Sequence, residues 1–140
     1  MTTSSVPTPP ATPEIPASHL DLLTQPLTAV LTTVGADGRP QSTAVWYLHD
    51  GATLRTSLLT TRQKYKNLQR SPVAGLFVLD PTNPFRTLEI RADVELAPDP
   101  DKTLLPLFAK HYGVDESMLD VPGSERVIAT LHPVRVVTNG

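Results

Sequence analysis

The chain has 140 residues, a length that suits one domain with a hydrophobic core of its own. Its formal net charge of −2 argues against a general nucleic-acid binder, and its lack of cysteine excludes disulfides, thiolate metal sites and a thiol nucleophile. No apolar run approaches the ~18 residues of a membrane-spanning helix, and the N-terminus lacks the basic and apolar regions of a signal peptide. We therefore expect a cytoplasmic protein.

The N-terminal residues 1–13 are rich in Pro, Thr and Ser and poor in apolar side chains. Such a segment cannot bury enough surface to offset its ordering entropy, so it is predicted to be a disordered tail. A single folded domain is then expected over residues 14–140. It begins with a short helix within 17–26, which Ser18 is expected to cap and Pro26 to end.

Six strands are predicted from runs of β-branched and alternating apolar residues. Asp37 and Gly38 between the first two strands are a strong hairpin signal, and Pro133 in the last strand predicts a bulge or an edge position. The fourth segment is apolar on both faces, which predicts a central strand that is buried on both sides. The predicted strands cover residues 27–34, 41–48, 52–58, 73–80, 87–96 and 125–138.

A longer helix is predicted over residues 99–113, which have Asp near their start and basic residues near their end. Gly113 is its expected C-terminal cap, and Pro106 is expected to divide or kink it. Short hairpin connections between most strands favour a small antiparallel barrel, because closure removes exposed sheet edges. The predicted fold class is mainly β, with short helices outside the barrel.

Four basic residues fall close together in a chain that is otherwise slightly acidic: Arg62, Lys64, Lys66 and Arg70. Thr60 and Gln63 have the spacing of a capping box, which places Arg62 and Lys64 in the first turn of another helix. Positive side chains are unfavourable there because of the helix dipole, unless a phosphate or carboxylate binds the free N–H groups. An anion site and a solvated helix face both stay open for Arg62 and Lys64, whereas a solvated face is favoured for Lys66 and Arg70.

The segments DGRPQSTAVWY, TSL and TTRQKYKNLQRSPVAGLFV follow one another as strands, turn, helix and strand, and this order resembles the pyridoxamine 5′-phosphate oxidase-like family. Within that family the chain is most similar to the small actinobacterial branch that uses the deazaflavin coenzyme F420. The resemblance covers residues 15–138. It implies a six-stranded antiparallel split β-barrel of the FMN-binding type, a homodimer, and a flavin or deazaflavin bound between the subunits.

The resemblance also implies a set of cofactor-binding residues. Arg62 and Lys64 would hold the phosphate of the cofactor, Asn67 would fix that end of the helix, and Phe85 would reach toward the cofactor of the partner subunit. Further contacts would come from Gln41, Thr43, Ser57, Thr60 and Thr61. An ordinary structural role stays open for Gln41, Thr43, Ser57 and Phe85, and Trp46 is expected in the core rather than beside the cofactor.

The sequence shows no nucleophile–base pair, and its four histidines lie at spacings that suit no metal motif. An enzyme remains compatible with this, because in hydride transfer the cofactor carries the reaction. We therefore expect an F420-dependent oxidoreductase that reduces an electron-poor, conjugated small molecule in a pocket lined by loops 81–86 and 111–124. Three alternatives stay open: the same fold with FMN, a protein that binds the cofactor or haem without turnover, and a small-barrel nucleic-acid binder.

Overall fold

The computed structural model describes residues 12–140. Residues 1–11 of the predicted disordered tail lie outside the described part, whereas Thr12 and Pro13 are described and line a hollow beside the first helix. The strands are β1 (Ala29–Val34), β2 (Pro40–Val45), β3 (Leu48–His49), β4 (Leu54–Leu59), β5 (Val73–Asp80), β6 (Asn83–Pro98) and β7 (Arg126–Asn139). The helices are α1 (Asp21–Thr24), α2 (Gln63–Arg70), α3 (Leu104–Tyr112) and the 3-10 helix η1 (Glu116–Met118).

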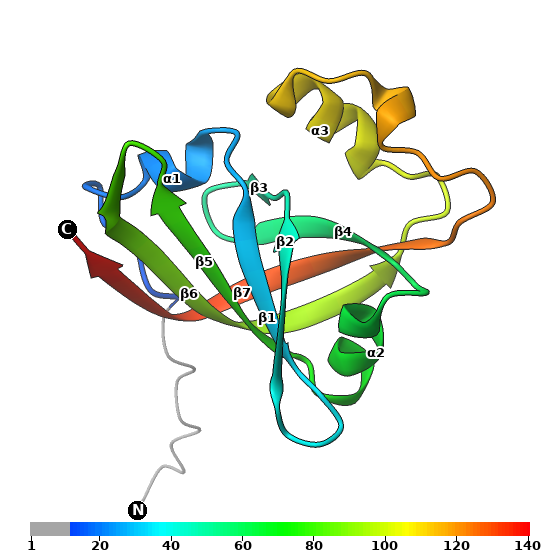
Figure 1. Cartoon of the computed structure of the whole chain (residues 1–140), viewed down its shortest axis with the longest axis horizontal. Coiled ribbons are helices and arrows are strands. Elements are labelled where there is room, and N and C mark those ends of the chain that lie inside the picture. Colours follow the sequence, from blue (N-terminus) through cyan, green and yellow to red (C-terminus); the bar gives the residue numbers. More distant parts are fainter. Residues whose placement is uncertain (1–11) are drawn as a thin grey trace, which may run out of the picture.

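The strands form one antiparallel sheet in the order β2-β1-β5-β6-β7-β4-β3. Figure 1 shows that the sheet curls strongly, with α2 beside one end of the curl and α3 above the other. The curl brings the end of β2 close to β4. Oγ1 of Thr56 in β4 donates to the carbonyl oxygen of Trp46, just beyond β2, at 2.8 Å. The predicted fold class is therefore confirmed as an antiparallel split β-barrel with short helices.

The sheet has seven strands instead of the predicted six, because the segment 41–48 divides in two. The break falls at Trp46 and Tyr47, between β2 and β3. Tyr47 is only 1% exposed and its hydroxyl donates to the carbonyl oxygen of Leu22 at 2.6 Å. A strand that continued straight through this point would carry Tyr47 away from that acceptor, so the chain bends here.

The core lies inside the curl and follows the alternation of the strands. Inward-facing side chains such as Leu31, Leu76, Ile90 and Leu131 are almost completely buried. Full burial of a Leu or Ile side chain contributes about 1.5–3 kcal/mol, so these residues supply much of the stability of the sheet. The alternation predicted for 87–96 is confirmed, since Leu88, Ile90, Ala92 and Val94 all face this core.

Strand β5 is central in the sheet, as predicted, but it is not buried on both sides. It pairs with β1 and β6, while Val73, Phe77 and Leu79 on its outer side are 41%, 38% and 45% exposed. The prediction counted apolar residues on both faces and assumed that one chain covers both. Here the outer face is left uncovered by the described residues of this chain.

The ends of the helices correct several further predictions. Helix α1 begins at Asp21, and Ser18 does not cap it, since its hydroxyl contacts Nδ1 of His19. Helix α3 begins at Leu104, so Pro106 lies in its first turn, where a missing N–H breaks no intrahelical bond and the helix is not divided. Gly113 is the C-terminal cap of α3, as predicted, with a φ of 69°.

The remaining turns follow their sequence signals. The β1–β2 hairpin turns at Asp37 and Gly38, where Gly38 has a φ of 82°. Pro133 lies at a β-bulge, because the register between β6 and β7 shifts where Ala92 opposes it. No helix within residues 12–140 has the length and apolar character needed to cross a bilayer.

Candidate functional site

Helix α2 follows β4 through a turn that differs from the predicted one. The N–H of Thr60 donates to the carbonyl oxygen of Glu125 at 3.1 Å, so this residue still belongs to the strand-like segment. The predicted capping box is absent: the helix begins at Gln63, Arg62 is its N-cap in an extended conformation, and no side chain caps it. The helix start was predicted two residues too early, since the N-cap is Arg62 and not Thr60; Arg62 therefore precedes the helix, while Lys64 lies in its first turn as predicted.

Lys64 extends from the first turn of α2 toward the edge strand β2. Its Nζ donates to Oγ1 of Thr43 at 3.3 Å, and the side chain is half-buried. Burial lowers the pKa of Lys64, and the charge of Arg62 lowers it further. None of the ion pairs within residues 12–140 involves Lys64, so this cation is partly removed from water without a carboxylate partner.

A cleft of about 220 Å³ opens where the two ends of the curled sheet approach each other. Its polar lining includes Ser57 on β4 and Lys64 on α2, and α3 and the loop before β7 close its other side. A shallower hollow of about 390 Å³ adjoins it and shares the wall formed by residues 44–46 and Leu119. The cleft is lined by Ala44, Val45, Trp46, Thr56, Ser57, Lys64, Leu105, Phe108, Leu119 and Arg126.

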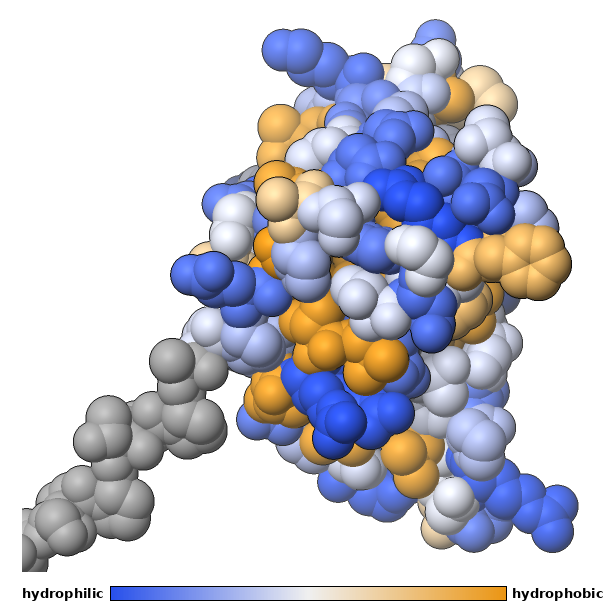
Figure 2. Space-filling model, turned by 90° about the vertical axis from the view of Figure 1, so that its left-hand side faces the viewer, coloured by the Kyte–Doolittle hydropathy of each residue, from blue (hydrophilic) through white to orange (hydrophobic). Residues whose placement is uncertain are grey.

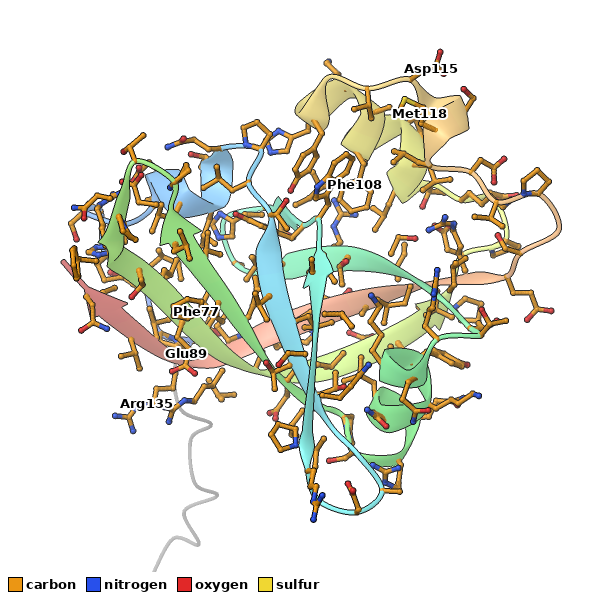
Figure 3. All side chains as sticks on the ribbon, in the orientation of Figure 1. Phe77, Glu89, Phe108, Asp115, Met118 and Arg135 are labelled. Atoms are coloured by element: carbon orange, nitrogen blue, oxygen red, sulfur yellow. The ribbon has the colours of Figure 1, made fainter. Side chains whose placement is uncertain are left out.

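Trp46 forms part of this cleft wall, which corrects its predicted place in the core. It is half-buried and stacks on Tyr112 of α3 with ring centroids 4.0 Å apart and planes 5° from parallel. The hydroxyl of Tyr112 donates to the carbonyl oxygen of Leu27 at 2.7 Å, which fixes the ring. Figure 3 shows Phe108 on the same helix, between α3 and the strands below it. The cleft therefore has one cationic and hydroxyl-bearing side and one aromatic side.

Arg126 is the cleft residue that the sequence did not reveal. It begins β7, and its Nη1 donates to Oγ of Ser57 at 3.2 Å while Nη2 donates to the carbonyl oxygen of Leu119 at 2.7 Å. Its buried Nε has no hydrogen-bond partner within the described residues. Only the pairing of β4 with β7 brings Arg126 to Ser57, and no local motif of the sequence signals that contact.

Asn67 and Gln41 form a second polar cluster, further along the same face of α2 as Lys64. Asn67 is fully buried; its Nδ2 donates to Oγ1 of Thr33 at 3.1 Å, and its Oδ1 accepts from Nε2 of Gln63 at 2.9 Å. Oε1 of Gln41 accepts from Thr33 at 3.1 Å and from Asn67 at 3.4 Å. This network joins α2 to β1 and β2, and a contact of Asn67 with the cofactor stays a prediction.

The other predicted site residues lie apart from the cleft. Thr61 and Arg62 are exposed on the turn before α2, and Thr60 is half-buried beside them. Phe85 is 83% exposed near the start of β6, close to the turn of the β5–β6 hairpin. Figure 1 shows this hairpin at the far end of the sheet from α2. Within one chain the structure thus brings together Thr43, Ser57 and Lys64, and it leaves Phe85 remote from them.

Comparison with known proteins identifies the family. Residues 15–138 match the family described as pyridoxamine 5′-phosphate oxidase. The chain belongs to this family. The domain of the pyridoxamine 5′-phosphate oxidase family thus spans nearly all of the described residues, and the family predicted from the sequence is confirmed.

Solved structures support the same assignment. A structure described as an F420 reductase is 36% identical, with a TM-score of 0.81 over 88% of this chain and 98% of that one. This likeness agrees with the predicted deazaflavin branch. A conserved hypothetical protein from Mycobacterium tuberculosis is 22% identical, with a TM-score of 0.71 over 95% and 89% of the two chains.

One similar structure carries a different description. The heme storage protein HutZ from Vibrio cholerae is 16% identical, with a TM-score of 0.70 over 88% of this chain and 93% of that one. At this identity the likeness shows the shared fold alone. None of the curated proteins compared with the chain matches it.

The side chains of the cleft fit an anionic, ring-bearing cofactor. Lys64 lacks a carboxylate partner, Ser57 offers a hydroxyl group, and Trp46 and Phe108 offer flat apolar surface, while Thr43 contacts Lys64 beside the cleft. The volume of about 220 Å³ falls below the roughly 300–1,000 Å³ of typical cofactor pockets. The adjoining hollow of about 390 Å³ extends this space along the wall formed by residues 44–46.

Proposed function

We propose that this protein is an F420-dependent reductase. The observation that carries the proposal is Lys64, a half-buried cation in the first turn of α2 that has no acidic partner in the described chain and faces a cleft with an aromatic wall. The likeness to an F420 reductase supports the choice of cofactor. The bound deazaflavin would supply a hydride to an electron-poor, conjugated small molecule.

In this proposal the residues of the chain bind and orient the cofactor. Arg62 and Lys64 hold its phosphate beside the free N–H groups of α2, where the helix dipole also favours negative charge. Ser57, Thr60 and Thr61 add hydroxyl contacts from the end of β4, and Gln41 and Thr43 contact it along β2. Trp46 and Phe108 exclude water from one side of the cleft.

FMN is the alternative cofactor, and the surface around α2 bears on the choice. A deazaflavin with an acidic tail needs basic contacts beyond the phosphate. Arg70 does not offer one freely, since its Nη2 donates to the carbonyl oxygen of Val34 at 2.6 Å. Lys66 is exposed and Arg39 pairs weakly with Asp37 at 3.9 Å, so these two residues are the free candidates for an acidic tail.

We also propose that the protein acts as a homodimer that completes the cofactor site. The outer face of β1, β5 and β7 exposes Val30, Phe77 and Val134, which are 40%, 38% and 56% exposed, and Phe77 and Val134 line a hollow of about 370 Å³. Figure 3 places Phe77 beside Glu89 and Arg135 on this side of the sheet, and Figure 2 shows apolar groups between charged ones on the adjoining end. A second chain on this face would cover the apolar groups and would allow Phe85 to approach the cofactor of the partner.

The cofactor is tested by mixing the purified protein with F420, FMN or haem and separating free ligand by gel filtration. F420 is expected to elute with the protein, and the absorption spectrum distinguishes the three ligands. Elution with FMN alone would replace the proposed cofactor by the alternative. Elution with haem, or with none of the three, would overturn the proposed function.

The dimer is tested by sedimentation of the protein at micromolar concentration. Phe77→Arg places a charge on the apolar face and is expected to give monomers with weaker cofactor binding. Leu107→Arg is the matched control, because Leu107 is 44% exposed on α3, away from this face. A wild-type monomer that still retains the cofactor would contradict the proposal.

A further inference from the structure

We infer that Arg126 binds a carboxylate of the molecule that accepts the hydride, so that the substrates of this protein are conjugated carboxylic acids. The inference rests on the proposed function and names the substrate class of the same cleft. Arg126 lies at the start of β7 and lines the cleft, where it contacts Ser57 and the loop before β7. Neither the family description nor the sequence signals around α2 point to this residue.

The charge of Arg126 is not neutralised by a contact within the described chain. None of the ion pairs of residues 12–140 includes it. The acids whose charges act on it are Asp99 and Asp120, and both have other partners: Asp120 pairs with Lys102 at 2.6 Å, and Asp99 accepts from Thr103 at 2.8 and 2.9 Å. Burial lowers the pKa of Arg126 more than these acids raise it.

The hydrogen bonds of Arg126 leave donors free. A guanidinium carries five N–H donors, and Arg126 uses one on Ser57 and one on Leu119. Its buried Nε makes no bond at all. A neutral side chain could join the loop to β4 without placing a charge away from water, so the two observed bonds do not explain an arginine here. The buried Nε is out of reach of a ligand, but a carboxylate in the cleft would accept from the remaining N–H groups of Nη1 and Nη2.

Arg86 is an arginine with a structural role in the same chain, and its partners differ from those of Arg126. Its Nη1 donates to Asp80 at 3.0 Å, and its guanidinium also pairs with Asp21. Two carboxylates therefore neutralise Arg86, which joins α1 to the β5–β6 hairpin. Arg126 is half-buried like Arg86 but has no carboxylate partner in the described chain, so its charge is available to a ligand.

The space in front of Arg126 suits a small conjugated acid. The cleft of about 220 Å³ opens into the hollow of about 390 Å³, and Trp46 lines both. A carboxylate at Arg126 would place the attached double bond or ring between the aromatic wall and the side of the cleft that carries Lys64 and Ser57. A neutral acceptor would leave the guanidinium without a counter-ion.

The test compares cinnamate with its neutral amide, cinnamamide, as probes of the full-length protein. Trp46 is the only tryptophan of the chain, so its indole N–H gives one NMR signal that reports binding in the cleft. Wild type is expected to bind cinnamate about tenfold or more tightly than cinnamamide, which is the size of effect that a charge-assisted contact gives. Arg126→Gln keeps a donor for Leu119 and is expected to abolish the preference, whereas Arg126→Lys is expected to keep part of it.

Arg55→Met is the matched control. Arg55 also has a buried Nε without a partner and lies on β4 two residues before Ser57, but it does not line the cleft. The preference for cinnamate is expected to survive this change. If Arg126→Gln fails to fold, the preference for cinnamate is measured in wild type and in Arg126→Lys. In both proteins a preference that depends on charge should weaken in high salt.

The inference is wrong if wild type binds cinnamate and cinnamamide equally well, or if it binds neither. It is also wrong if the preference for cinnamate persists in Arg126→Gln. The titration is run with and without bound cofactor, so a protein that fails to bind F420 still reports on Arg126. If bound cofactor abolishes the cinnamate contact, Arg126 serves the cofactor and the assignment to the acceptor is wrong.

Discussion

Two neighbouring polar side chains on one face of helix α2, Asn67 and Lys64, differ in how the chain satisfies them. Asn67 is fully buried, and Gln63, Thr33 and Gln41 satisfy its amide. Lys64 is half-buried, has one long contact with Thr43 and lacks a carboxylate in the described chain. A polar group that is satisfied from within stabilises the fold, whereas one that is left without its partner indicates where a ligand belongs.

Lys64→Ala is expected to give the largest effect on binding. Charge-assisted bonds to a phosphate contribute about 1.5–3 kcal/mol, so affinity for the cofactor should fall about ten- to a hundredfold. The apoprotein should be equally stable or more stable, because the change removes a cation that burial disfavours. Cofactor titration and urea unfolding measure the two quantities. Unchanged affinity together with lower stability would show that Lys64, like Asn67, has a structural role.

Asn67→Ala is expected to give the opposite pattern. Loss of the buried amide leaves Gln63 and Thr33 short of partners, which costs about 1–3 kcal/mol of unfolding free energy. Affinity per folded molecule should change far less than in Lys64→Ala, because Asn67 does not line the cleft. Urea unfolding checks the first statement and calorimetric titration the second. A stable variant that fails to bind cofactor would show that Asn67 contacts the ligand.

Arg62→Ala is expected to weaken cofactor binding by about tenfold, with a strong dependence on salt. Arg62 is exposed at the N-cap of α2, so water screens its charge more than that of Lys64. Lys66→Ala is the control, because Lys66 is exposed further along the same helix; it should matter little for FMN and more for a cofactor with an acidic tail. Equal losses for both changes with FMN would point to general electrostatic attraction instead of a phosphate site.

Deletion of residues 1–11 is expected to have the smallest effect. Their Pro, Thr and Ser content gives little apolar surface to bury, so melting temperature and cofactor affinity should stay unchanged. The deletion stops before Thr12 because Thr12 and Pro13 line the hollow next to α1. A clear fall in affinity would show that the tail reaches the cofactor site.

Local signals predicted much of the fold. Asp37-Gly38, Gly113 and Pro133 each mark a backbone requirement that only a few residue types meet, and the structure has a hairpin, a helix cap and a bulge at these positions. The capping box at Thr60 failed because the backbone of Thr60 pairs with Glu125, a contact distant in the chain. The break at Trp46 and Tyr47 likewise depends on the carbonyl oxygen of Leu22, which no local pattern reveals.

The candidate site was predictable only where its residues lie in one stretch. Lys64 and Ser57 stand close together in the sequence around α2 and β4, and both line the cleft. Arg126 reaches the same cleft through the pairing of β4 with β7. Its proposed role in ligand binding depends on the lack of a carboxylate partner in the described chain, which a sequence does not show. The uncovered face of β5 was also missed, because a sequence shows that residues are apolar but not which molecule covers them.

The pairing of β4 with β7 has a consequence for the order of folding. The β1–β2 and β5–β6 hairpins join neighbours in the chain, whereas Leu54 of β4 pairs with Leu131 of β7. Closing so long a loop costs more chain entropy than forming a hairpin, so we expect these two strands to meet late in folding. Pulsed hydrogen exchange should then protect the amides of β5 and β6 before those of β4, and early protection of β4 would contradict this order. Because Ser57 and Arg126 lie on the two late strands, a refolding chain should acquire its hairpins first and the cleft between these strands and α3 only at the end.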